Sequence, residues 1–329
     1  MFVPIRHWVG RAVKYLQEVL PDDRTCRLAI KCPAPIRGPN RQWGDYYFAH
    51  SLKSAFEALG YRVRVDLRPD WYSSEASRDE VVVVLRGREK YEINSRQINL
   101  LWLISHPDIV CDTELEKFDY VFVASSSYSC ILASRLKVPV GELLQCSDNA
   151  VFYPPATNET AYSTEVLFVG NSRGEMRPAV ADALAQKLPL SIFGHGWAKF
   201  LPADQIQAAH IPNSLLHKYY AHAKIVLNDQ WPDMEREGFI SNRIFDVALS
   251  GGFAISKDFK GADFFGEDLV TYRTPDELGE LCRYYLTHEA ERKEKAERMR
   301  QRTLSFYTFL HRARVMAEVT SNIRQTKSQ

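Results

Sequence analysis

Polar residues at the start of a predicted helix make "EGFISNRIFDVALSGGFAIS" (residues 237–256) the most informative segment of the chain. Ser241, Asn242 and Arg243 can all contact an anion, and the amides and positive dipole end of a helix start suit a diphosphate. Asp246 follows one turn later, where a carboxylate can accept both hydroxyls of a ribose. The segment therefore predicts a nucleoside-diphosphate site, and the alternative is a capped core helix with an incidental arginine.

A second candidate anion site is "LFVGNSRGEMR" (residues 167–177), a strand followed by a polar turn and a helix start. Gly170 lets the backbone approach a ligand, Asn171 lies in the same turn, and Arg173 and Arg177 can place positive charge on a phosphate. The pattern is neither GxGxxG nor a Walker motif, which disfavours dinucleotide and P-loop sites. The alternative is an ordinary strand-to-helix turn with exposed arginines.

A glycine-flanked loop, "IFGHGW" (residues 192–197), offers candidates for the nucleobase pocket. His195 and Trp197 carry flat rings that can line such a pocket. Packing of Trp197 in the core explains this residue equally well.

Candidate acceptor contacts follow predicted strands in the first half of the chain. Ser105, His106 and Asp108 emerge at the carboxyl end of a buried strand, where a histidine can position or deprotonate an acceptor hydroxyl. A histidine at a strand end is also often only a satisfied hydrogen-bond partner. Asp45 and Asp148 are further acceptor-side carboxylates, and Asp45 also fits the N-cap of the helix that follows it.

The elements that must position these residues predict two α/β domains. Short apolar segments alternate with helical ones, which is typical of parallel sheets with crossover helices. The proline-rich residues 149–163 predict a linker. We therefore expect two Rossmann-like doubly wound domains facing across a cleft, with ligands at the carboxyl ends of the strands.

The expected domain bounds follow from this linker. Residues 1–150 form the acceptor-side domain, and residues 151–329 form the donor-binding domain plus C-terminal helices. The predicted strands lie in 26–35, 61–67, 80–87, 99–105, 120–125, 140–145, 165–170, 190–197, 224–229, 253–256 and 269–273, with a helix over 46–60.

Bulk properties exclude several classes of function. A formal net charge of +1 over 329 residues argues against nucleic-acid binding. The six cysteines contain no CxxC pair, so neither a zinc site nor a disulfide framework is indicated. Basic residues interrupt the apolar positions of residues 1–20, unlike a signal peptide or membrane span. We expect a helix packed on its own domain there, with peripheral membrane contact as the alternative.

The order of these motifs resembles the CgeB-like set of group-1 nucleotide-sugar glycosyltransferases. The likeness covers about residues 26–310 and is strongest over 219–256. It implies a GT-B fold and transfer of a sugar from a nucleoside-diphosphate sugar to a hydroxyl of a glycan, lipid-linked or protein acceptor, with retention and without a cofactor or bound metal. It also implies a cytoplasmic location, possible contact with the inner membrane face, and a role in cell-surface glycan synthesis.

Carried over by position, the resemblance implies that Asp246 binds the ribose, while diphosphate contacts fall on Arg173, Ser241, Asn242 and Arg243. In the resulting hypothesis Arg243 stabilises the leaving diphosphate, and the acceptor hydroxyl enters near His106 and Asp45. Group-1 enzymes often carry two glutamates eight positions apart here, but this chain has Gly238 at the earlier position, beside Glu237. A sugar-nucleotide epimerase of the same fold, or a degenerate binding protein, is the alternative.

Overall fold

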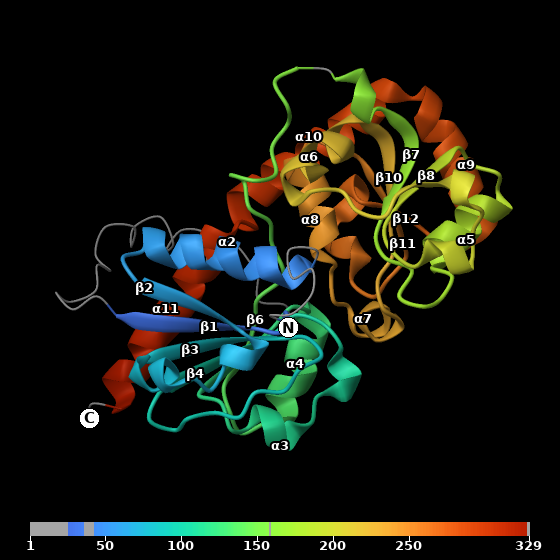
Figure 1. Cartoon of the computed structure of the whole chain (residues 1–329). Coiled ribbons are helices and arrows are strands. Elements are labelled where there is room, and N and C mark those ends of the chain that lie inside the picture. Colours follow the sequence, from blue (N-terminus) through green and yellow to red (C-terminus); the bar gives the residue numbers. More distant parts are fainter. Residues whose placement is uncertain (1–25, 36–42, 158, 328–329) are drawn as a thin grey trace.

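The first lobe of the protein is a six-stranded parallel sheet in the order β2-β1-β3-β4-β5-β6 (Figure 1). The computed structural model describes residues 26–35, 43–157 and 159–327. The central strands β3 and β4 are buried along their whole length and are apolar except for Arg86 and Asn99, because helices cover both faces of such a sheet. The elements of this lobe are β1 (Arg27–Cys32), α2 (Gly44–Ala58), β2 (Arg62–Leu67), β3 (Val81–Arg86), β4 (Ile98–Leu103), α3 (Asp112–Leu115), β5 (Tyr120–Val123), α4 (Ser126–Arg135) and β6 (Val140–Glu142).

The second lobe is another six-stranded parallel sheet, in the order β12-β11-β10-β7-β8-β9. The strands predicted from the sequence are present in both lobes, which confirms the α/β fold class. Strand β9 was not predicted, because its three residues are too few to establish a periodicity. The elements are β7 (Thr164–Val169), α5 (Pro178–Ala185), β8 (Leu190–Phe193), β9 (Ile206–Ala208), α6 (Asn213–His222), β10 (Ala223–Asn228), α7 (Pro232–Glu237), α8 (Asn242–Leu249), β11 (Ala254–Lys257), β12 (Val270–Tyr272), α9 (Pro275–Thr287) and α10 (Glu289–Phe306).

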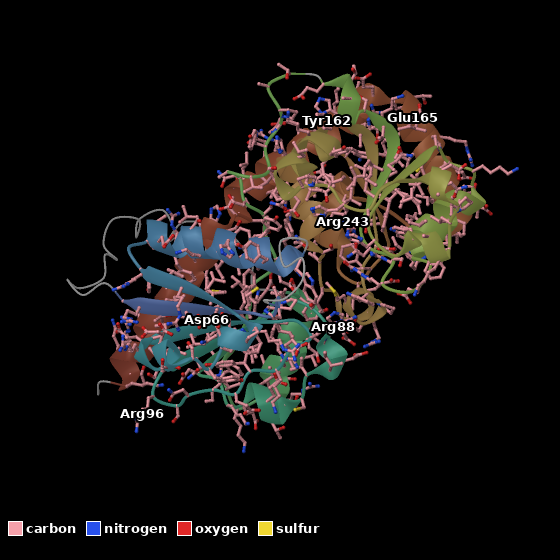
Figure 2. The ribbon with its side chains drawn as sticks, in the orientation of Figure 1. Asp66, Arg88, Arg96, Tyr162, Glu165 and Arg243 are labelled. Atoms are coloured by element: carbon pink, nitrogen blue, oxygen red, sulfur yellow. The ribbon has the colours of Figure 1, made fainter. Side chains whose placement is uncertain are left out.

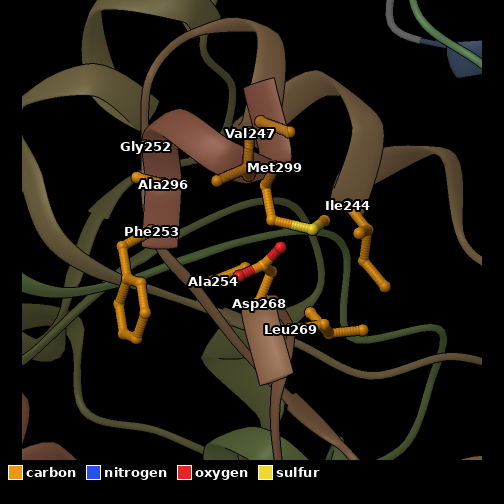
Figure 3. A pocket seen from close by; sticks show the side chains of 10 residues that line it. Ile244, Val247, Gly252, Phe253, Ala254, Asp268, Leu269, Ala296 and Met299 are labelled. Atoms are coloured by element: carbon orange, nitrogen blue, oxygen red, sulfur yellow. The ribbon is translucent and has the colours of Figure 1, made fainter. Parts of the chain in front are cut away.

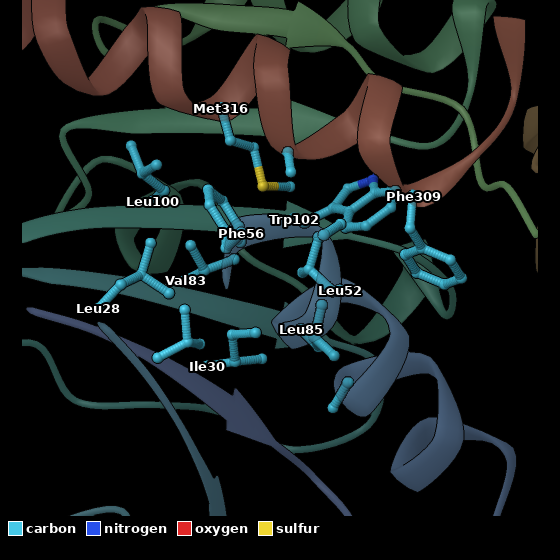
Figure 4. Close-up of a cluster of buried hydrophobic side chains, with 14 of the residues drawn as sticks. Leu28, Ile30, Leu52, Phe56, Val83, Leu85, Leu100, Trp102, Phe309 and Met316 are labelled. Carbon is cyan, nitrogen blue, oxygen red and sulfur yellow. The ribbon is translucent and has the colours of Figure 1, made fainter. Parts of the chain in front are cut away.

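The last helix, α11 (Phe309–Lys327), returns to the first lobe and packs against α2. Phe309 and Met316 join Trp102 of β4 in one buried apolar cluster (Figure 4). The sequence prediction grouped all C-terminal helices with the second domain, and α11 departs from it because its apolar residues complete the core of the first. The division of roles near residue 150 stays a prediction.

The two lobes are joined by two chain crossings and by a docked helix. At the crossings, the Ser147 amide donates to the Tyr307 carbonyl at 3.1 Å, next to a bridge between Ser147 and Thr308. Beside α7, Phe239 of the second lobe is buried in the apolar core of the first. These contacts hold the carboxyl ends of the second sheet toward the first lobe.

The predicted amphipathic helix of residues 1–20 lies outside the described residues. Among the helices that the structure describes, none combines the length and apolar character needed to cross a bilayer. All six cysteines are free thiols.

Candidate functional site

A cavity of about 250 Å³ lies between the two lobes, at the carboxyl ends of strands β7 and β8. This is the position at which doubly wound sheets bind their ligands. Five of the predicted donor-site residues line it. Those five are Gly170, Asn171, Asn242, Arg243 and Asp246, and the first lobe contributes α2, Cys146, Asp148 and Phe309.

The floor of the cavity is a close approach of two glycines at the ends of β7 and β8. The Gly170 amide donates to the Phe193 carbonyl at 2.8 Å. Gly194 has φ 145°, and a Cβ at this position would lie only 2.1 Å from the Gly170 oxygen. A Cβ on Gly170 would in turn lie 3.1 Å from Nη2 of Arg243. The glycines therefore leave room for the arginine beside the backbone.

Arg243 is held toward the cavity by neutral partners. Its Nη1 donates to Oδ1 of Asn228 at 3.1 Å, and Nδ2 of Asn228 donates to Oγ of Ser256 at 2.9 Å. Among the described residues, no carboxylate oxygen lies within 4.0 Å of the Arg243 guanidinium. Figure 2 shows Arg243 on the side of the second lobe that faces the first. Its charge is positioned but not neutralised, as an anion site requires.

Asp246 also faces the cavity, one turn of α8 after Asn242. Nδ2 of Asn242 donates to Oδ2 of Asp246 at 3.0 Å, and the aspartate is 8% exposed. Burial raises the pKa of Asp246 to about 7. A buried carboxylate with one amide donor still has lone pairs for two hydroxyls.

The helix that carries these residues begins as the sequence predicts. Ser241 is the N-cap of α8, although its side chain makes no capping bond and its amide donates to Oε1 of Gln230 at 3.2 Å. Upstream, Gly238 caps the end of α7 with φ 77°, and a Cβ there would lie 2.8 Å from the Lys260 carbonyl. An acidic residue is therefore sterically disfavoured at position 238. Glu237 is paired with Arg236 at 2.9 Å.

Two of the predicted donor contacts brace the turn after β7 rather than line the cavity. Arg177 is buried, forms an ion pair with Asp229, and donates to the Asn171 carbonyl at 3.1 Å. Trp197 is 1% exposed, and its Nε1 donates to the Gly170 carbonyl at 2.8 Å. Their polar groups are thus used within the protein, and a direct donor contact by either residue stays a prediction.

Because Arg177 forms a buried ion pair with Asp229, a substitution at Arg177 distinguishes a structural role of this residue from a ligand-binding role. We expect Arg177→Ala to destabilise the second lobe by about 3–5 kcal/mol, because it leaves the carboxylate of Asp229 buried without its partner. Thermal unfolding checks this, with exposed Arg96→Ala as the control. An Arg177→Ala protein that keeps its melting temperature but loses nucleotide binding would instead make Arg177 a ligand contact.

Two other predicted donor residues lie next to the cavity without lining it. His195 is exposed, and its amide donates to Oδ1 of Asn171 at 2.9 Å. The backbone of Arg173 adopts φ 63°, and its guanidinium lies 3.9 Å from the ring centroid of Trp231. Both residues therefore flank the cavity on the turns that shape it.

The predicted acceptor residues after β4 meet helix α7 of the second lobe. Nδ1 of His106 lies 3.8 Å from Oδ2 of Asp233, and Asp108 forms an ion pair with Arg236. Burial lowers the pKa of His106, an effect that the nearby Asp233 partly opposes. Ser105 lies beside Gly87 at the end of the strand. This group borders the interface between the lobes and does not line the cavity.

The two other predicted acceptor-side carboxylates, Asp45 and Asp148, differ in their position relative to the cavity. Asp148 lines the cavity, whereas Asp45 does not. Helix α2 begins at Gly44 with Trp43 as its N-cap, so the interpretation of Asp45 as the N-cap is wrong. Asp45 lies in the first turn, where burial raises its pKa to about 6.

Sequence reasoning missed most of the apolar lining of the cavity. Aromatic and apolar side chains form one wall, although their spacing in sequence indicates only helix packing. A flat, apolar wall of this kind can hold a nucleobase. The missed residues include Phe48, Phe152, His210, Ile211, Leu216 and Tyr220.

A second, much smaller cavity lies beneath α8 and is a packing void (Figure 3). Its volume is about 10 Å³, enough for about one water molecule. Its lining is apolar apart from Asp268, whose Oδ1 accepts from Nε of Arg298 at 2.6 Å. It therefore offers no room for a ligand.

Comparisons with known proteins identify one similar family and several similar folds. Residues 175–318 match a protein family described as glycosyl transferase-like. None of the curated proteins matches the sequence. Sucrose-phosphate synthase from Thermosynechococcus elongatus has a similar structure, with a TM-score of 0.68 and 12% identity over 92% of this chain and 100% of that one.

Two further solved structures show the same architecture. HepE from Anabaena, in complex with UDP and glucose, has a TM-score of 0.62 and 11% identity over 90% of this chain and 100% of that one. The β-glucosyltransferase of T4 phage has a TM-score of 0.55 and 10% identity over 91% of this chain and 98% of that one. The chain therefore has the GT-B fold, and its residues 175–318 are similar to the glycosyl transferase-like family.

Proposed function

We propose that this protein transfers a sugar from a nucleoside-diphosphate sugar to an acceptor hydroxyl. The observation that carries the proposal is the cavity in which an unneutralised Arg243 and the buried Asp246 face the same space as the Gly170 turn. One positive group for a diphosphate and one acceptor for ribose hydroxyls, at this spacing, fit a nucleoside diphosphate better than free phosphate.

In this mechanism the leaving diphosphate is stabilised by Arg243 and by the amides of the turn after β7. Arg173, predicted as a further diphosphate contact, lies beside this cavity with its guanidinium over the Trp231 ring. Arg243 and the amides act where negative charge develops as the glycosidic bond breaks, which is the usual source of such catalysis. We propose that they suffice without a bound metal and that the anomeric configuration is retained. The acceptor enters from the first lobe near His106 and Asp45, and closure of the lobes excludes water.

The comparisons support the choice of donor class. The Anabaena protein of the same fold was solved with UDP-glucose and with UDP. The order of motifs supports a place in the CgeB-like set of glycosyltransferases. A glycan, lipid-linked or protein acceptor, a cytoplasmic location and a role in cell-surface glycan synthesis are part of the same proposal.

A nucleotide-binding screen tests the proposal. We expect one of UDP, GDP, CDP, dTDP or ADP to raise the melting temperature, with or without EDTA, because a ligand that binds only the folded state stabilises it. The corresponding nucleotide sugar is then incubated with candidate acceptors, and NMR of the product reports its anomeric configuration. Absence of any shift at millimolar nucleotide contradicts a donor site. Conversion of the nucleotide sugar without release of nucleotide would identify an epimerase.

A further inference from the structure

Cationic side chains from both lobes surround Trp231, the residue that precedes α7. The guanidinium of Arg173 lies 3.9 Å from the centroid of the Trp231 ring, and that of Arg88 lies 4.8 Å from it. The ring of His106 lies 5.0 Å away from the same ring. We call Arg88, His106, Arg173 and Trp231 the Trp231 cluster. None of the four lines the cavity assigned to the donor.

Neither arginine of the Trp231 cluster forms an ion pair with a described residue, although the carboxylates of Glu175 and Asp233 lie near enough to Arg173 to raise its pKa slightly against the effect of burial. No described carboxylate oxygen lies within 4.0 Å of either guanidinium. Within the described ranges, Arg88 donates only its Nε, to Nε2 of His106 at 3.3 Å, and Arg173 forms no side-chain hydrogen bond. Burial, with Arg243 as the next cause, lowers the pKa of Arg173 to about 9. Most of the N–H groups of this pair are therefore available to an anion.

The backbone also holds two members of the cluster in an unfavourable conformation. His106 has φ 55° and Arg173 has φ 63°, and Lys187 is the remaining non-glycine residue with positive φ in the described chain. Such conformations persist only where surrounding contacts enforce them, and they concentrate at functional sites. Here they bring one side chain from each lobe against the same indole.

We propose that the Trp231 cluster is a second anion subsite, which recognises a phosphate or carboxylate group on the acceptor. The inference rests on the proposed function, in which Arg243 and the Gly170 turn take the donor diphosphate. Arg88 follows β3 of the first lobe, on the acceptor side, and Figure 2 shows it near the junction of the lobes. Its two terminal nitrogens can contact an oxyanion in a bidentate manner.

Titration of inorganic phosphate and of glucose 6-phosphate, against glucose, tests the subsite in the whole protein. Each compound is added to protein saturated with the nucleotide found by the screen, and also to protein without nucleotide. We expect both phosphates to bind, glucose to bind more weakly, and Arg88→Gln to reduce phosphate affinity at least tenfold. Arg96→Gln is the matched control, because Arg96 is an exposed arginine at the far end of the first lobe (Figure 2).

Equal phosphate affinity in wild type and Arg88→Gln, or no phosphate binding at millimolar concentration, overturns the subsite even if nucleotide binds. If the protein binds no nucleotide, but phosphate binds to wild type and not to Arg88→Gln, the result supports the subsite and contradicts the proposed donor site. A third arm compares UDP-glucuronate with UDP-glucose in the absence of acceptor. A preference for UDP-glucuronate that Arg88→Gln abolishes would assign the anion to the transferred sugar and overturn the acceptor assignment.

Discussion

Arg243→Ala is expected to reduce sugar transfer by about two to three orders of magnitude, the usual cost of removing one group that stabilises developing charge. Arg243 faces the cavity, its partner Asn228 is neutral, and Arg243 forms no ion pair with a described residue. Removing the guanidinium raises the pKa of the nearby buried Asp246 further, and the carboxyl can then take up a proton. We therefore expect the melting temperature without ligand to stay within a few degrees of wild type. Initial rates with the nucleotide sugar identified by the screen measure the effect.

Two variants make this result specific to the position of the charge. Arg96→Ala removes an exposed arginine elsewhere and is expected to keep full activity. Arg243→Lys keeps a point charge but loses the planar fork, so we expect partial activity. Near-normal turnover of Arg243→Ala, with its fold intact, would remove Arg243 from the site and leave α8 as an ordinary capped helix.

Much of the fold is readable from the sequence because buried parallel strands have a simple pattern. "EVVVVLRG" and "NLLWLIS" are apolar on both faces, and the structure places them as the central strands β3 and β4. The return of α11 to the first lobe was not predictable in this way. Its periodicity indicates an amphipathic helix, but the sheet that its apolar face covers is set by tertiary contacts with α2 and Trp102.

The candidate site was predictable where a residue follows a strand or opens a helix. Asn171 and Asp246 meet at one cavity because the carboxyl ends of parallel strands share one edge of a sheet. The sequence does not specify which charged side chains, distant in the chain, form ion pairs in the folded protein. Arg177 is neutralised by Asp229, far away in the chain, whereas Arg173 in the same turn is left without such a partner. Arg173 and Arg177 are the same residue type in the same segment, so the sequence does not distinguish the paired arginine from the unpaired one.

Asp246→Asn is expected to stabilise the empty protein while weakening nucleotide binding. Burial raises the pKa of Asp246 to about 7, above the value of about 3.9 in an unfolded chain. The folded state then binds more protons than the unfolded state between these values, so wild type loses stability as pH rises from about 4 to about 7. Asparagine keeps the shape and an acceptor oxygen for Asn242 but carries no charge.

The stability difference between Asp246→Asn and wild type should therefore grow between pH 4 and 7, by on the order of 3 kcal/mol, and stay constant above pH 8. Melting temperatures at pH 5 and pH 8 measure it, and exposed Asp204→Asn is the control that should show no such growth. Nucleotide affinity at pH 8 should fall at least tenfold, because an ionised carboxylate accepts ribose hydroxyls more strongly than an amide. A variant that is stabilised yet binds nucleotide like wild type would separate Asp246 from the ribose, whereas a destabilised variant would contradict its buried charge.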